Sequence, residues 1–207
     1  MKTLKESILN RSSHGAKGFE AQRIEAIEKW LKEYNIKEYT INDDSTIDVN
    51  GNVFLSREDF KEFPEYIQFG MIRGGFYCSL NHLSSLRGCP RIVEGDFNCT
   101  YNELTSLEGA PIIVRGDFYC NNNRLTSLKG APKEVSIDYN CSYNKLISLE
   151  GAPENVGGLF DCSHNKLTSL EGAPREVGRL FDCSKNNIQF TEEDVRKVCK
   201  VNKKIIV

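Results

Sequence analysis

Apolar and polar positions alternate along most of this chain with a fixed period of 21 residues. Six columns of like residues repeat at that interval, and a row of prolines follows them. A unit this short cannot bury its own apolar side chains, so successive units must stack on one another. The columns are cysteine (Cys78 to Cys183), aromatic (Phe76 to Phe181), asparagine (Asn81 to Asn186), leucine (Leu83 to Ile188, and Leu86 to Leu170) and valine (Val93 to Val177).

Written as one unit, the repeat is V-x-x-G-x-F-x-C-x-x-N-x-L-x-x-L-x-G-A-P. The x-F-x-C-x segment alternates like a strand, which predicts a parallel sheet with one strand per coil. Glycine and proline in the Gly-Ala-Pro segment disfavour a helix, so the other side of each coil is expected to be extended or turn-like. A degenerate coil with Val53 and Leu55 precedes the six regular ones, which gives seven coils.

The two ends of the chain predict different elements. Apolar residues at helical spacing indicate an amphipathic helix over 19–34, with a shorter helix over 4–9. Strands are expected at 39–41 and 47–49, and the Asn50-Gly51 pair is typical of a hairpin turn leading into Val53. Thr191 followed by acidic residues predicts a helix to about residue 200, and a last strand is expected at 205–207. We therefore expect an N-terminal helix and hairpin cap (1–50), a repeat solenoid (51–190) and a C-terminal cap (191–207).

The middle of the unit resembles the leucine-rich-repeat core L-x-L-x-x-N-x-L, with Phe and Cys in the two strand positions. The segment YTINDDSTIDVNG, followed by repeats of the type GDFYC..N.LTSLEGAP, is similar to small leucine-rich-repeat proteins of tailed bacteriophages and prophages. The repeats also resemble the short leucine-rich repeats of bacterial effectors. The resemblance covers nearly the whole chain. It implies an α/β leucine-rich-repeat solenoid with its parallel sheet on the concave face, and a viral or bacterial origin.

Charge and composition narrow the possible partners. The chain carries 27 Lys and Arg against 29 Asp and Glu. Residues 41–190 contain 14 of the basic residues and 20 of the acidic ones. This acidic middle region would repel a polyanion, so no nucleic-acid partner is expected. The sequence contains no apolar segment as long as a membrane span or a signal peptide, so we expect no membrane partner and a cytoplasmic protein, in the host cytoplasm if it is phage-encoded.

The cysteine column invites a metal or redox interpretation, but the chain has no C-x-x-C pair, and its three histidines lack ligand spacing. We interpret each cysteine as a small apolar residue facing the core, and each asparagine as a partner of backbone groups at the turn. The nearest approach to a nucleophile and base is Cys162 with His164, and alternation places the two on opposite sides. We predict no catalytic residue, no metal site and no cofactor.

The outward positions of the strand are where the repeats differ from one another. They combine aspartate, tyrosine and two leucines, and tyrosine is enriched where proteins bind proteins. We predict a non-enzymatic module that binds a protein, such as a host defence component, and whose aspartates favour a basic patch on the partner. A structural or virion-associated role through the N-terminal cap is the alternative, and the oligomeric state is left open. The predicted contact residues are Asp96, Asp117, Asp138, Tyr77, Tyr119, Asp161, Asp182, Tyr101, Tyr143, Leu159 and Leu180.

Overall fold

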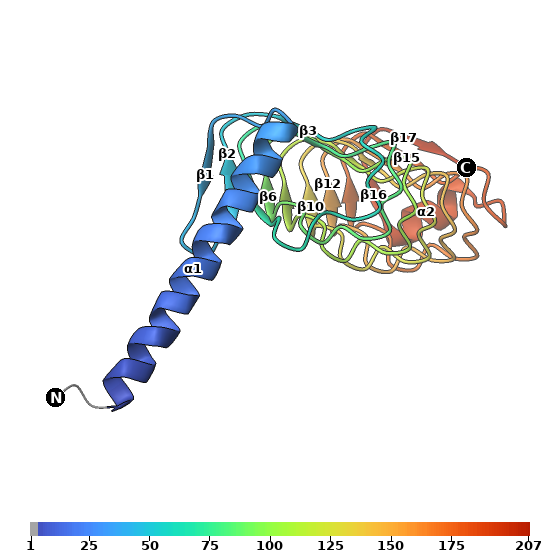
Figure 1. The fold of residues 1–207 in the computed structure, drawn as a ribbon. Helices are drawn as coiled ribbons and strands as arrows, with labels where there is room; N and C mark the ends of the chain where they lie inside the picture. The colour runs from blue at the N-terminus through green and yellow to red at the C-terminus, as the bar shows by residue number, and fades with distance from the viewer. Residues whose placement is uncertain (1–3) are drawn as a thin grey trace.

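A computed structural model of the protein describes residues 4–207, with side chains from residue 19 onward. The backbone winds into a solenoid of eight turns, and each turn gives one strand to each of two parallel sheets (Figure 1). The turns stack from the first strands near helix α1 (Leu4–Glu33) to the C-terminal end. The expected parallel stacking of coils is thus confirmed.

Sheet A has nine strands, and its first strand is antiparallel to the second. In spatial order they are β1 (Tyr39–Ile41), β2 (Ile47–Val49), β4 (Phe69–Ile72), β6 (Ile92–Val93), β8 (Ile113–Val114), β10 (Glu134–Val135), β12 (Asn155–Val156), β14 (Glu176–Val177) and β16 (Lys200–Val201).

Sheet B has eight strands and contains the predicted x-F-x-C-x segments. In chain order they are β3 (Val53–Phe54), β5 (Phe76–Tyr77), β7 (Phe97–Asn98), β9 (Phe118–Tyr119), β11 (Tyr139–Asn140), β13 (Leu159–Asp161), β15 (Leu180–Asp182) and β17 (Lys204–Ile206).

The core is enclosed by the two sheets and by the non-strand segments that carry the two buried leucine columns. Sheet A contributes the valine column, and sheet B contributes the aromatic and cysteine columns, all of them buried. Within the regular repeats, neighbouring strands pair 21 residues apart, for example Phe97 with Phe118, so equivalent side chains lie on top of one another. The rings of Phe118 and Tyr139 stack with their centroids 5.1 Å apart and their planes within 7°. Such pairs add about 0.5 to 1.5 kcal/mol beyond the area that they bury.

The asparagine column ties each turn to the one before it. Asn123 donates through Nδ2 to the backbone oxygens of Cys99 (3.0 Å) and Cys120 (3.0 Å), and its Oδ1 accepts from the backbone N–H of Leu104 (3.1 Å). The same bonds recur at Asn102, Asn144 and Asn165. These buried amides satisfy backbone groups that water cannot reach, so the predicted structural role of the column is confirmed.

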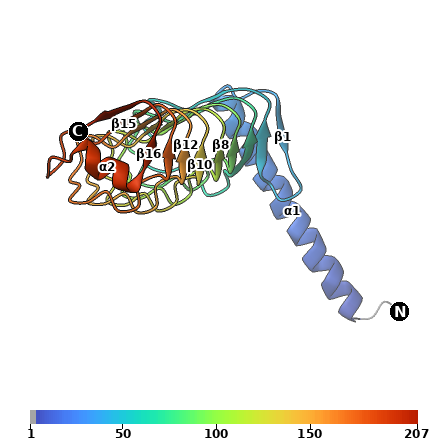
Figure 2. The same ribbon diagram turned by 180° about the vertical axis from the view of Figure 1, so that it is seen from behind.

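The N-terminal helix packs on the first turns through its C-terminal part. Ile27, Trp30 and Leu31 are buried, and the Trp30 ring lies 6.2 Å from that of Phe69. The N-terminal half of α1 projects away from the stacked turns (Figures 1 and 2). The helix runs unbroken from Leu4 to Glu33, so the prediction of two helices is wrong. The segment contains no proline, and its glycines each cost a helix only about 1 kcal/mol.

At the other end, the helix predicted after Thr191 is present as α2 (Glu192–Val198), and Thr191 is its N-cap residue. The Thr191 hydroxyl accepts from the backbone N–H of Asp194, and the Asp194 carboxylate accepts from the backbone N–H of Thr191. The two strands that follow, β16 and β17, join sheets A and B. They form an eighth turn that the count of seven coils missed, because Val201 and Ile205 there replace the repeat residues.

Two further predictions are wrong. Asn50-Gly51 does not close a hairpin, because β2 and β3 belong to different sheets and the pair turns the corner between them. The strands at 39–41 and 47–49 do form the expected hairpin, around Asn42 to Thr46. Ile188, assigned to a leucine column, is 45% exposed. Phe190 is buried at this end of the core, where the chain leaves the repeat.

Candidate protein-binding face

The outer side of sheet B carries the side chains that alternate with the buried aromatic and cysteine columns. We call this surface the sheet B face, and it has three rows along the axis of the solenoid. The rows are Gly75, Asp96, Asp117, Asp138, Leu159 and Leu180; Phe54, Tyr77, Asn98, Tyr119, Asn140, Asp161 and Asp182; and, at the strand exits, Leu80, Tyr101, Asn122, Tyr143, His164 and Lys185.

The three aspartates of the first row are bonded to the sheet itself. Asp96 Oδ1 accepts the backbone N–H of Asp117 (3.0 Å), and Asp117 Oδ1 accepts that of Asp138 (2.9 Å). Asp138 continues the row by accepting from the N–H of Leu159 (2.7 Å). One oxygen of each carboxylate therefore accepts a hydrogen bond from the adjacent turn. The sequence repeat alone did not reveal these bonds. Because this oxygen is already bonded within the chain, it would form only a weaker hydrogen bond with a partner.

Two predicted tyrosines lie against these aspartates. The Tyr119 hydroxyl donates to Asp117 Oδ2 (2.8 Å), and the Tyr77 hydroxyl donates to Asp96 Oδ2 (3.3 Å). Partial burial, followed by the adjacent carboxylate, raises the pKa of both phenols above the ordinary value. Both rings are half-buried, so they form a fixed part of the face rather than mobile side chains.

Asp161 and Asp182 are held differently. Oδ1 of Asp182 accepts from the backbone N–H of Ser184 (3.0 Å) and from its hydroxyl (2.7 Å). Asp161 Oδ1 accepts from the backbone N–H of Ser163 (2.9 Å). The two residues are paired directly across β13 and β15, as are Leu159 and Leu180. The structure therefore brings these four predicted residues together in one patch at the C-terminal end of the face.

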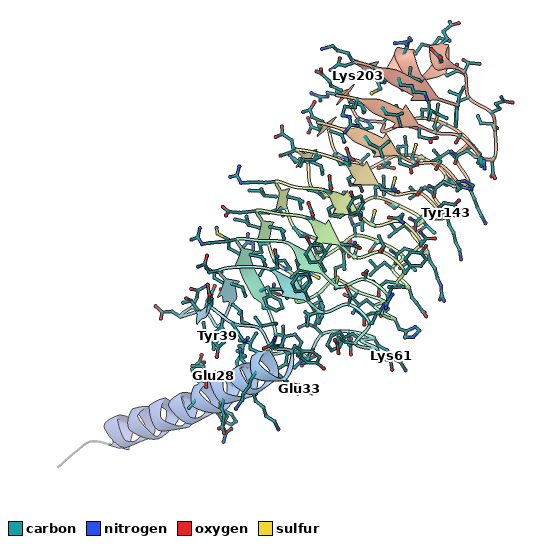
Figure 3. The ribbon with its side chains drawn as sticks, turned by 90° about the horizontal axis from the view of Figure 1, so that it is seen from above. Glu28, Glu33, Tyr39, Lys61, Tyr143 and Lys203 are labelled. Atoms are coloured by element: carbon teal, nitrogen blue, oxygen red, sulfur yellow. The ribbon has the colours of Figure 1, made fainter. Side chains whose placement is uncertain are left out.

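The strand-exit row has an unusual backbone. All six residues have positive φ, from 52° to 56°. This left-handed conformation is disfavoured for residues other than glycine and asparagine. It directs Tyr101 and Tyr143 to the surface, where they are 54% and 52% exposed. Tyr143 lies at the margin of the stacked turns (Figure 3). Its ring stacks on that of His164 with centroids 4.0 Å apart, and its hydroxyl lies 3.1 Å from His164 Nε2.

Phe54 is the surface residue that sequence reasoning missed. Its ring is 64% exposed and stacks on Tyr77 with centroids 5.2 Å apart and planes within 11°. The signal was present, because the degenerate coil with Val53 and Leu55 inward places Phe54 outward in the same row as Tyr77. An exposed ring stacked on a fixed one presents a flat apolar surface.

The cysteines face the interior, as predicted. All eight are free and buried. In the column, Cys120 Sγ lies 3.4 Å from the backbone oxygen of Asn140 and Cys162 Sγ lies 3.3 Å from that of Asp182, in the next turn. Burial raises the pKa of Cys120 and Cys183 to about 12, which suppresses the reactive thiolate. Cys162 is buried while His164 stacks at the surface, so the two do not form a nucleophile and base pair.

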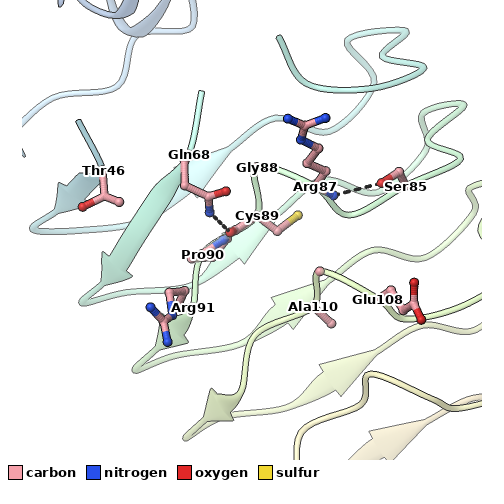
Figure 4. Close-up of a pocket in the computed structure, with 11 residues that line it drawn as sticks. Thr46, Gln68, Ser85, Arg87, Gly88, Cys89, Pro90, Arg91, Glu108 and Ala110 are labelled. Carbon is pink, nitrogen blue, oxygen red and sulfur yellow. Dashed lines mark hydrogen bonds between the residues drawn. The ribbon is translucent and has the colours of Figure 1, made fainter. Parts of the chain in front are cut away.

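A hollow of about 620 Å³ lies away from the sheet B face, beside the Gly-Cys-Pro segment at Gly88 to Pro90 (Figure 4). Gln68 Nε2 donates to the backbone oxygen of Cys89 (2.9 Å) in its wall. Burial raises the pKa of the Cys89 thiol well above its ordinary value. The lining of the hollow contains one carboxylate and no histidine. The carboxylate is that of Glu108, whose Oε1 lies 3.1 Å from Lys129 Nζ. The hollow therefore presents no activated nucleophile.

Among residues 19–207, no three histidine, cysteine or acidic side chains form a group that could hold a metal ion. Neither helix of the described residues combines the length and the apolar character of a membrane-spanning segment. Comparison with known proteins finds no matching family model, no matching curated protein and no matching solved structure.

Proposed function

We propose that the protein is a non-enzymatic binding module with a leucine-rich-repeat type of fold, and that it holds a protein partner on the sheet B face. In this proposal sheet B is the concave, ligand-facing side, and α1 and α2 cap the ends of the solenoid. A phage-encoded protein acting on a host protein, such as a defence component, is the setting that we favour.

The observation that carries the proposal is the set of exposed rings on this face. Phe54, Tyr101 and Tyr143 are each more than half exposed although they are large and partly apolar. Their backbone is fixed by the stacked turns, so a partner would lose little conformational entropy in covering them. Aromatic side chains in such positions dominate the binding energy of many protein interfaces.

The aspartates of the face differ in how many carboxylate oxygens remain open to a partner. Asp96 and Asp117 each use both carboxylate oxygens in bonds within the chain. Asp161 and Asp182 use one oxygen locally, Oδ1, so they are better placed to meet a basic patch beside Leu159 and Leu180. We therefore place the polar contacts of the partner at the C-terminal end of the face.

Capture from a bacterial lysate tests the proposal. We expect the triple variant Phe54→Ser, Tyr101→Ser, Tyr143→Ser to lose a partner that the parent retains, because three exposed rings leave the surface. Its thermal unfolding should change little, since exposed side chains contribute little to the core. The readout is quantitative mass spectrometry of the retained proteins.

The matched control is the variant Ile112→Ser, Ile113→Ser. Ile112 is 57% exposed, and both residues lie at sheet A, on the other wall of the solenoid. If the control loses the partner as completely as the triple variant does, non-specific hydrophobic association explains the capture and the assignment of the binding face is wrong.

A structural or virion-associated role is the second candidate. The observation that favours it is the projection of α1 away from the stacked turns, which would suit a tether (Figure 2). Mass spectrometry of purified phage particles distinguishes the two roles, because a virion component must be present in the particles in stoichiometric amounts.

A further inference from the structure

A row of basic side chains runs along the flank of the solenoid. Each of its residues follows a residue of the strand-exit row by two positions in the sequence. Arg124, Lys145 and Lys166 occupy the same place in three successive turns. Each donates its backbone N–H to the preceding turn, and the three distances are all 2.9 Å (to Leu104, Leu125 and Leu146). Stacking therefore fixes the backbone of these three basic residues in a line, and Lys185 of the strand-exit row lies one turn further along the solenoid. We call these four residues the basic ridge.

Carboxylates within the chain leave most of the ridge uncompensated. Arg124 pairs with Glu103 at 3.0 Å, but within residues 19–207 no ion pair forms at Lys145, Lys166 or Lys185. All four side chains are exposed. The ridge residues lie in consecutive turns, outside the strands, so their like charges repel and a bound anion would reduce the repulsion. The remaining positions of these two rows from Asn122 to Asn187 are asparagine, Tyr143 and His164, so the ridge contains no acidic residue.

From these observations we infer that the basic ridge binds an acidic peptide segment in extended conformation. Strands spaced about 4.8 Å apart place Arg124 and Lys166 about 10 Å apart along the axis. An extended peptide carries side chains of one face about 6.8 Å apart, so two or three alternating carboxylates span the ridge. The long lysine side chains can adjust to the difference in spacing.

The surroundings favour a short acidic peptide over a nucleic acid. Glu103 lies at one end of the ridge, and Asp161 and Asp182 lie on the neighbouring sheet B face. A continuous polyanion would meet these carboxylates on leaving the ridge, whereas a short segment fits between them. The inference stands independently of the proposed function, because the ridge can bind a probe peptide even if the exposed rings have no partner.

Fluorescence anisotropy with a labelled hexapeptide of alternating glutamate and glycine tests the inference, with the glutamine and glycine hexapeptide as comparator. We expect the glutamate peptide to bind more tightly, and the variant Lys145→Glu, Lys166→Glu to weaken its binding by about fivefold or more, the sum of two modest exposed ion pairs. Higher salt should weaken binding by the parent.

The matched control is Lys37→Glu, Lys133→Glu, which changes the net charge equally at two exposed lysines elsewhere. Circular dichroism verifies that both variants fold. An equal loss in the control would show that net charge alone attracts the peptide and would overturn the inference. So would equal binding of the two hexapeptides, no binding at millimolar concentration, or tighter binding of a labelled ten-residue oligothymidylate than of the glutamate peptide.

Discussion

At the scale of the residue, the repeated positions have two kinds of task. Cysteine, phenylalanine and asparagine recur because each fits an equivalent place in every turn of the core. The aromatic rings stack on their copies, whereas the cysteine thiols and the asparagine amides contact backbone oxygens of an adjacent turn. The strand-exit residues recur in conformation but not in chemistry. Their shared positive φ costs roughly 1 to 3 kcal/mol each when the residue is neither glycine nor asparagine. The sheet bonds on both sides hold them in place.

The cysteines give a direct test at this scale. Because burial raises the pKa of Cys120 to about 12 and that of Cys199 to about 11, thiolates are scarce in the folded protein at pH 8. We expect a colorimetric thiol reagent to react slowly with the folded chain and rapidly with all 8 cysteines in guanidinium chloride. Rapid reaction of several thiols without denaturant would contradict the burial of the column.

At the scale of the element, the aspartate row shows how a surface residue can also serve the sheet. Each carboxylate accepts the N–H of the next turn, a bond that the regular strand ladder does not supply. Asn52 plays the same part in the first turn, where its Oδ1 accepts from the backbone N–H of Gly75 (2.7 Å). The bond between turns therefore requires an acceptor oxygen and does not require a negative charge.

Paired substitutions separate these two properties. We expect Asp117→Ala to lower the free energy of unfolding by about 1 to 2 kcal/mol, because the N–H of Asp138 and the Tyr119 hydroxyl both lose an acceptor. Asp117→Asn keeps the acceptor and should cost much less, as measured by chemical denaturation. If the two variants unfold alike, the bond between turns does not stabilise the sheet.

The elements also differ in how far the sequence alone predicted them. The 21-residue period identified sheet B and its inward residues, because identical side chains must stack. Sheet A was not anticipated, because a strand such as β8 carries a single inward residue, whereas each x-F-x-C-x segment of sheet B carries two and so shows alternation. The bond from the backbone N–H of Asp138 to Asp117 was missed because it joins residues 21 positions apart through a backbone group. Phe54 was missed because its coil is degenerate.

At the scale of the whole molecule, the two sheets and the columns between them form one continuous core from α1 to β17. Such a stack keeps the surface side chains of successive turns in register, so chemistry repeated along the sequence becomes a stripe in space. The basic ridge is such a stripe. The exposed rings Phe54, Tyr101 and Tyr143 come instead from two rows of the neighbouring sheet B face and lie in alternate turns. We propose above all that a protein partner covers these rings.

Site-specific photocrosslinking tests that claim most directly. A benzoylphenylalanine in place of Tyr101 reports a protein within reach of the sheet B face, and the same residue in place of Ile112 reports contacts of the sheet A side. After irradiation in bacterial lysate, we predict a discrete adduct of one partner from position 101 and none from position 112. An adduct from position 112 alone, or none from position 101, would contradict the proposal that this face holds a protein.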